Sequence, residues 1–353
     1  MGTEASAHRI FDRYKDRLRR DSVNHTLNPV LDEDESWNTA FMTAQSCLNV
    51  PSNLSNLIRN CWSGIWDHRD LNRNLGFIPV NSKCLLRAAE ISVDNGEERH
   101  ADDVARAVQM LGVRTTAVVL AINFVSQTVL DRNPPDRLWT GIFREMMNLI
   151  EIGYKFGSRA DGIGSEGGML MGFAKSIGLA LLLAEYPKEF SEWYAKTRGV
   201  DSPKFVQKSF GCESYQVGAA AMQQLGFGSD IAIASALAVG HLNHDLIEVP
   251  PHILHWKATY LWIESLRNGQ SYPADIGSRY IFNGLTPPRE GESCSPALSA
   301  LYNQVAQIRR KQSLWMWHLP VAGYDEMVKV LVERRKQANY KTSRGTMVIQ
   351  QRG

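Results

Sequence analysis

Residues 167–187 read GGMLMGFAKSIGLALLLAEYP, an apolar stretch that is interrupted in its middle by the polar pair Lys175-Ser176. An apolar run of this length and composition predicts a helix. A lysine followed by a serine breaks the pattern at one place only. The pair is therefore the first position at which to look for function.

Helix signals dominate from about residue 52 to the end of the chain, and the alternating pattern of strands is scarce. In residues 101–112, ADDVARAVQMLG, apolar side chains recur on one helical face, and Gly112 supplies a left-handed C-terminal cap. Residues 214–226, SYQVGAAAMQQLG, repeat the pattern. Prolines at 134–135 and 250–251 break the chain before two further helices. The sequence predicts an all-α fold of roughly a dozen helices joined by short turns.

Three regions are predicted along the chain. Residues 1–50 form an N-terminal extension, in which a basic amphipathic stretch precedes an acidic run. Residues 51–283 form the main helical domain. Residues 284–353 form a linker rich in turn-forming residues and a C-terminal helical segment, with helices expected near 297–311 and 322–339.

The composition is that of a globular protein, with 353 residues, a formal net charge of +2 and 44% hydrophobic residues. So small a net charge produces no global field that would attract nucleic acid or an anionic membrane. The five cysteines are scattered without a C-x-x-C pair, which indicates neither a disulfide framework nor a cysteine-ligated zinc. A reducing, cytoplasmic location is the simplest expectation. No uncharged apolar run approaches the ~18–20 residues that span a bilayer.

The N-terminus satisfies the short myristoylation pattern, with Gly2 after the initiator methionine and Ser6 four residues later. A pattern with so few fixed positions is weak, and a single acyl chain gives only marginal, reversible membrane binding. We therefore do not expect a lipid anchor at Gly2. The same segment lacks the apolar core of a secretory signal.

Several motifs resemble, in order and spacing, those of the HDOD domain, the HD-related output domain of bacterial signalling proteins. Residues 71–92, LNRNLGFIPVNSKCLLRAAEIS, and the block that ends at Gly112 resemble its first half, although Ile78 replaces an acidic residue before a proline. Residues 168–183 resemble the helix that carries a His-Asp pair in related hydrolases, and residues 214–236 resemble a later block. The resemblance covers roughly residues 50–250. It implies a multi-helix, HD-superfamily-like bundle of bacterial origin.

The resemblance implies that the His-Asp pair maps onto Lys175-Ser176. HD-type hydrolases use such side chains to hold divalent metals that activate water. A lysine presents a cation where a metal needs a lone pair, and no histidine lies between His100 and His241. We therefore expect a catalytically empty domain without a cofactor, in which Phe173, Lys175 and Ser176 mark a cleft for a small ligand. Lys175 could pair there with an anion such as a nucleotide phosphate, although a surface lysine is the simpler account.

A second set of residues offers a metal site elsewhere. Residues 241–255, HLNHDLIEVPPHILH, hold four histidines; His241 and His244 would be neighbours on a helix, with Asp245 beside them. Histidine is also favourable at a helix C-terminus, and the two prolines leave the direction of each pair unfixed. The alternative function is thus a metal-dependent phosphohydrolase or phosphodiesterase that uses His241, His244 and Asp245. Four carboxylates could ligate magnesium if they converged, namely Glu145, Glu151, Asp161 and Glu166.

Three basic clusters lie at residues 17–20, 309–311 and 334–336. We expect them to be solvated helix faces, because no nucleic-acid recognition motif accompanies them. The sequence therefore favours a non-catalytic module of signal transduction or regulation that acts through a protein partner. A small molecule or a nucleotide in the cleft would be its further ligand.

Overall fold

The computed structural model describes residues 35–78, 83–91, 103–197, 203–242, 249–289 and 292–311. In these residues the chain forms α-helices and one 3-10 helix, with no strand, so the prediction of an all-α fold is confirmed. The elements are α3 (Glu35–Leu48), α4 (Ser52–Trp62), α5 (His68–Leu75), α6 (Lys83–Ile91), α7 (Val104–Leu111), α8 (Val113–Asp131), α9 (Asp136–Gly157), α10 (Gly164–Glu185), α11 (Pro187–Thr197), α12 (Pro203–Phe210), α13 (Ser214–Leu225), α14 (Asp230–Ala238), α15 (Pro251–Arg267), α16 (Ile276–Tyr280), η2 (Asn283–Leu285) and α17 (Pro296–Lys311).

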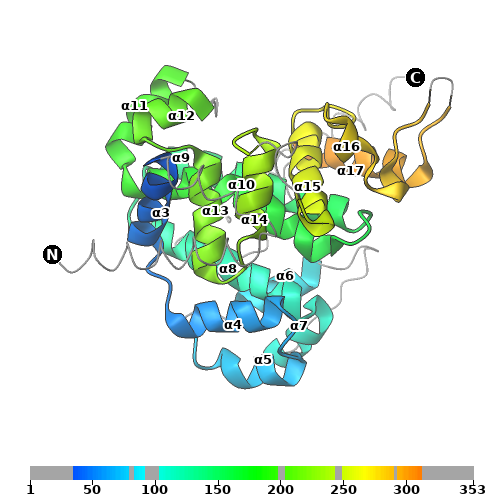
Figure 1. Ribbon diagram of the computed structural model, residues 1–353. Helices are drawn as coiled ribbons and strands as arrows, with labels where there is room; N and C mark the ends of the chain where they lie inside the picture. Colours follow the sequence, from blue (N-terminus) through cyan, green and yellow to red (C-terminus); the bar gives the residue numbers. More distant parts are fainter. Residues whose placement is uncertain are drawn as a thin grey trace, which may run out of the picture.

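The apolar stretch of residues 167–185 forms most of the central helix, α10. It packs most extensively against α9 and α13 and also contacts α3, α8 and α15, as Figure 1 shows. Nearly all of its residues from Gly167 to Ala184 are buried, on every side of the helix. A helix that is apolar all round is stable in water only when other helices cover it completely. This burial explains the missing amphipathic pattern of the sequence.

Glycines let α10 approach its two main neighbours backbone to backbone. A Cβ atom on Gly168 would lie 1.9 Å from the carbonyl oxygen of Gly153 in α9, and one on Gly178 would lie 1.7 Å from the carbonyl oxygen of Ser214 in α13. No side chain fits at these distances. The small residues of α10 therefore fix how closely the three central helices pack.

A group of shorter helices lies below the central helices in Figure 1: α4, α6 and α7 pack on α8, and α5 packs on α4 and α7. α7 and α8 meet at Gly112, whose φ of 80° is readily adopted only by glycine, so the chain turns a sharp corner between them. Gly226, with φ 105°, ends α13 in the left-handed conformation. Both helix ends match the sequence prediction, but Gly112, with a ψ of 158°, does not adopt the left-handed cap conformation expected there. α9 likewise begins directly after Pro135, and α15 begins at Pro251, the second proline of its predicted break.

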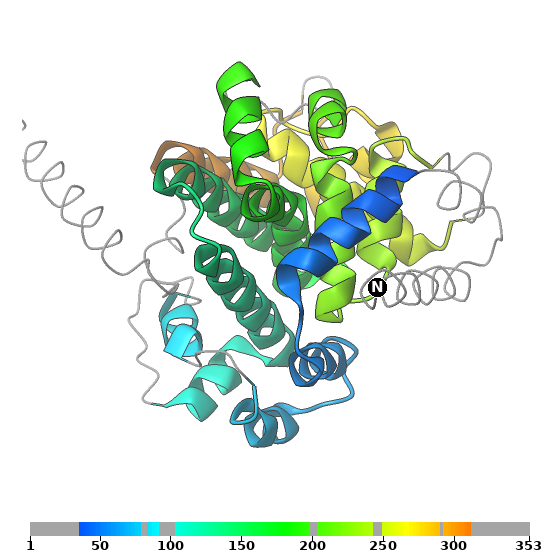
Figure 2. The same cartoon turned by 90° about the vertical axis from the view of Figure 1, so that its left-hand side faces the viewer.

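Helices outside the predicted main domain also pack on the core. α3 crosses the front of Figure 2 and packs against α13 and α10, with Trp37 and Phe41 buried. α17, which begins at Pro296 close to the predicted position, packs against α9 and α15. The division at residues 50 and 284 stays a prediction, but α3 and α17 are integral to the packing. The expected helix near 322–339 lies outside the described residues.

Two helices, α8 and α10, are long and apolar enough to cross a membrane by length and composition alone. In this structure most of α8 and nearly all of α10 are buried against other helices of the same chain. Their apolar character is thus accounted for by the interior of the bundle.

Candidate functional site

A pocket of about 240 Å³ opens between α9, α10, α11 and α15. α10 contributes Lys175, Ser176 and Leu179, and the C-terminal end of α15 contributes Arg267. The remaining walls are Gly141, Ile142, Arg144, Glu145 and Leu149 of α9, with Phe190, Trp193 and Tyr194 of α11. Two of the three residues that the sequence marked as a cleft, Lys175 and Ser176, therefore face one concave site.

Lys175 is held inside the bundle by two groups of α15. Its Nζ lies 2.7 Å from Glu264 Oε2 and 3.2 Å from the centroid of the Tyr260 ring. The side chain is only 4% exposed. The simpler account of Lys175 as a surface lysine is therefore wrong. A buried ammonium is stable only where a counter-charge compensates for its lost hydration, and here the aromatic face adds to that compensation.

The ion pair also acts on the carboxylate. Burial would raise the pKa of Glu264, but the Lys175 ammonium, aided by the Arg267 guanidinium and an Asn268 hydrogen bond, lowers the pKa below its ordinary value. Asn268 Nδ2 donates to Glu264 Oε1 at 3.0 Å. Both oxygens of Glu264 are thus occupied, and the carboxylate stays ionised at neutral pH.

Ser176 and Phe173 differ in their surroundings. The Ser176 hydroxyl donates to the carbonyl oxygens of Gly172 and Phe173, at 2.9 and 3.0 Å, so its proton is committed to the helix backbone. Phe173 is fully buried and is not among the residues that line the pocket. Of the predicted cleft residues, Phe173 contributes to the core and not to this wall. Helical spacing accounts for the difference, because a residue two positions before Lys175 points elsewhere on the helix.

A second ion pair lies at the pocket wall. Arg267 Nε is 2.5 Å from Glu145 Oε1, and the two side chains are 31% and 38% exposed. Arg267 therefore joins α15 to α9 across the pocket, as Lys175 and Glu264 join α10 to α15. Sequence reasoning missed Glu264, Arg267 and Trp193, because no spacing connects them with Lys175.

His241 is engaged by neighbours on both sides of its ring. Its Nδ1 lies 2.7 Å from the Tyr215 hydroxyl, and its Nε2 lies 3.4 Å from Glu213 Oε1. The contacts connect the end of α14 with the start of α13. His244 and Asp245, the other members of the alternative metal site, lie outside the described residues.

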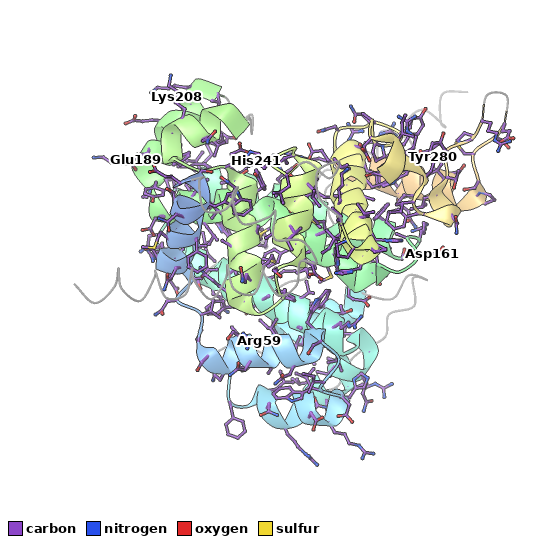
Figure 3. The ribbon with its side chains drawn as sticks, viewed as in Figure 1. Arg59, Asp161, Glu189, Lys208, His241 and Tyr280 are labelled. Atoms are coloured by element: carbon purple, nitrogen blue, oxygen red, sulfur yellow. The ribbon has the colours of Figure 1, made fainter. Side chains whose placement is uncertain are left out.

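The four carboxylates proposed as magnesium ligands have separate surroundings. Glu145 pairs with Arg267, and Glu166 lies 3.9 Å from Arg114. Glu151 is buried, whereas Asp161, labelled in Figure 3, is exposed. Across the described segments, no group of three or more His, Cys, Asp or Glu side chains is placed to hold a metal ion.

The buried cysteines are poor nucleophiles. Burial raises the pKa of Cys61, Cys84 and Cys212 to about 12, so their thiols are protonated at neutral pH. Burial also raises the pKa of Cys47, whose thiol donates to Leu181 O. These four side chains serve as small apolar groups of the core.

Comparison with solved structures identifies the fold of the chain. The chain is similar to an HDOD domain protein of unknown function from Geobacter sulfurreducens, with 12% identity, a TM-score of 0.54 and coverage of 78% of this chain and 98% of that chain. It is also similar to a candidate phosphohydrolase from Shewanella amazonensis SB2B, with 16% identity, a TM-score of 0.50 and coverage of 80% and 98%. No family model and no curated protein match the sequence. At these identities the similarity concerns the fold, and the chain therefore has the all-helical fold of HDOD and HD-type proteins that the motifs predicted.

Proposed function

We propose that this chain is a non-catalytic regulatory module of signal transduction, which acts through contact with a protein partner and takes a small ligand in the pocket beside Lys175. One observation carries the proposal: Lys175 lines the pocket, and its ammonium group is buried and fixed by Glu264 and Tyr260. A divalent metal bound next to it would be repelled by a fixed positive charge in a poorly solvated site. The pocket is thus better suited to a ligand than to HD-type metal chemistry.

The surroundings of the pocket support transmission to another surface. Lys175 and Glu264 join α10 to α15, and α15 packs in turn against α14, α16 and α17. A ligand that disturbs this ion pair would therefore act on a helix with several further contacts. A regulatory protein needs such a connection between its ligand site and the surface that its partner contacts.

A turnover and metal assay on the full chain tests the proposal. We expect no metal above buffer background and no hydrolysis of phosphomonoesters or cyclic dinucleotides with added Mg²⁺ or Mn²⁺. We also expect one protein to be retained from a native lysate in a stoichiometric complex. Metal-dependent turnover that the His241→Ala variant loses would replace the regulatory account with the phosphohydrolase alternative at His241, His244 and Asp245.

A further inference from the structure

Most polar side chains that line the pocket carry hydrogen-bond donors and no acceptor atoms. Lys175, Arg144, Arg267 and Trp193 carry only donors in their side chains. The carboxylate of Glu145 is engaged by Arg267, and that of Glu264 by Lys175 and Asn268. A ligand that fits this wall must bring acceptor oxygens of its own.

One N–H bond of the Lys175 ammonium lacks an acceptor in the described part of the chain. The ammonium carries three N–H bonds; one faces Glu264 and another faces the Tyr260 ring. Among the described residues it makes no further ion pair or hydrogen bond. With the side chain almost completely buried, a ligand oxygen in the pocket is the acceptor that the remaining N–H would take.

Trp193 provides a second, independent indication that the pocket holds a ligand. The residue lines the pocket and is 3% exposed, yet its Nε1 has no hydrogen-bond partner in the described part of the chain. A buried N–H without an acceptor costs free energy, so such groups in folded proteins call for an explanation. Nε1 has almost no accessible surface in this structure. A ligand oxygen in the pocket would therefore accept from Trp193 only if the indole ring shifts when the ligand binds.

The charges around the pocket favour an anion. Three cations, Arg144, Lys175 and Arg267, stand against two carboxylates, Glu145 and Glu264. Arg144 is exposed and forms no ion pair within the segments described here. It is therefore placed to attract an anion from solvent towards the buried Lys175.

The rest of the wall is apolar. Ile142, Leu149, Leu179 and Phe190 line the pocket next to the Trp193 indole. Its volume of about 240 Å³ lies below the range of about 300–1,000 Å³ that holds drug-sized ligands. The space suits a ring or a short aliphatic chain.

We infer that the pocket binds a small organic oxyanion, a carboxylate or a phosphate ester with an aromatic or aliphatic body. The oxyanion accepts from Lys175 and Trp193, and the body packs against Leu149, Leu179 and Phe190. The inference rests on the proposed function, since it names the class of ligand for the same site.

Binding to the full chain is measured by calorimetry and by thermal unfolding with four probes: benzoate, phenyl phosphate, inorganic phosphate and neutral benzyl alcohol. Benzoate or phenyl phosphate, at ten times its Kd, should raise Tm by about 2 °C. Comparing these two probes separates a carboxylate ligand from a phosphate ester. Inorganic phosphate lacks the apolar body and benzyl alcohol lacks the charge, so both should bind at least tenfold more weakly.

Two tryptophan variants locate the site. Trp193→Phe removes the unpartnered N–H and keeps an aromatic ring, so it should weaken binding of the organic anion about tenfold or more. Trp139→Phe is the matched control, because Trp139 is also buried with an unpartnered Nε1 but does not line the pocket. The Trp139→Phe variant should bind the organic anion as tightly as the unmodified chain does. Lys175→Met should abolish binding.

The outcomes separate this inference from the proposed function. If neither anion binds, if benzyl alcohol binds as tightly, or if Trp193→Phe and Trp139→Phe behave alike, the inference is overturned, while a chain without turnover still supports the regulatory role. If phenyl phosphate binds in a Trp193-dependent manner and is also hydrolysed, the pocket is supported and the non-catalytic function fails.

Discussion

Lys175 and Glu264 form an asymmetric ion pair. The Nζ and Oε2 atoms are 2.7 Å apart, but the lysine side chain is 4% exposed whereas the glutamate side chain is 37% exposed. The lysine depends on its partner for compensation of a buried charge, while the glutamate retains access to water. If the pair were broken, the lysine of α10 would therefore be the buried charge left without compensation, and the glutamate of α15 would not.

Truncating either partner tests this asymmetry. Glu264→Ala leaves the buried Lys175 ammonium without a counter-charge and should lower the free energy of unfolding by about 3 kcal/mol, the lower end for a broken buried pair. Lys175→Met leaves a carboxylate that water can solvate, so it should cost about 1 kcal/mol or less. Urea denaturation of both variants measures the difference. Equal losses would show that the exposure of the two side chains does not govern their coupling.

Acid should weaken the same interaction. Because the pKa of Glu264 is lowered in the folded state, its contribution to stability is complete above its ordinary pKa and is lost as pH falls through the lowered value. The gap in unfolding free energy between the unmodified chain and Glu264→Gln should be largest near pH 7. It should shrink progressively below about pH 5. Denaturation of both proteins across this range measures the gap, and a gap that stays constant with pH would refute the assignment.

The glycine at the crossing of α10 and α13 should not tolerate a methyl group. A Cβ on Gly178 would lie 1.7 Å from Ser214 O, so Gly178→Ala forces the helices apart and should destabilise the chain by about 3 kcal/mol or more. Gly141 in α9 is the matched control, since a Cβ there meets nothing within 4 Å. Gly141→Ala should stabilise the helix by about 0.5–1 kcal/mol. Similar stability of the two variants would contradict the close crossing.

Added metal should leave the protein unchanged. His241, the described member of the alternative metal site, already contacts Tyr215 and Glu213 through its ring nitrogens. Zn²⁺ or Mn²⁺ should therefore not raise Tm of the full chain, and the His241→Ala variant should respond in the same way. A metal-dependent rise in Tm that this variant lacks would indicate a bound ion at His241.

Much of the fold could be predicted from the sequence because its signals are local. Glycines and prolines restrict their own backbone, so their positions indicate where helices end or begin. Gly112 and Gly226 mark two helix ends, and the prolines before α9 and α15 mark two helix starts. The length and apolarity of residues 167–187 likewise indicated a helix, but its burial on every side became evident only in the structure. The close crossings at Gly168 and Gly178 depend on which helices meet, and spacing within one helix does not give that.

Only part of the candidate site could be predicted from the sequence, for the same reason. Lys175 and Ser176 stood out because they interrupt an apolar run, but the lysine was expected at the surface, where an unpaired charge belongs. Its burial depends on Glu264 and Tyr260, which come from a helix far along the chain. Trp193 gave no signal, since an unpartnered indole N–H is a property of the folded state.

The central claim is that the pocket beside Lys175 holds an oxyanion without turning it over. Phosphorus NMR of phenyl phosphate mixed with the full chain and Mg²⁺ observes both parts in one sample. The account predicts that the phosphate ester resonance shifts or broadens on binding and that no inorganic phosphate appears over hours. A growing resonance of inorganic phosphate would contradict it. An ester resonance that the protein leaves unchanged would also contradict it if benzoate does not bind either.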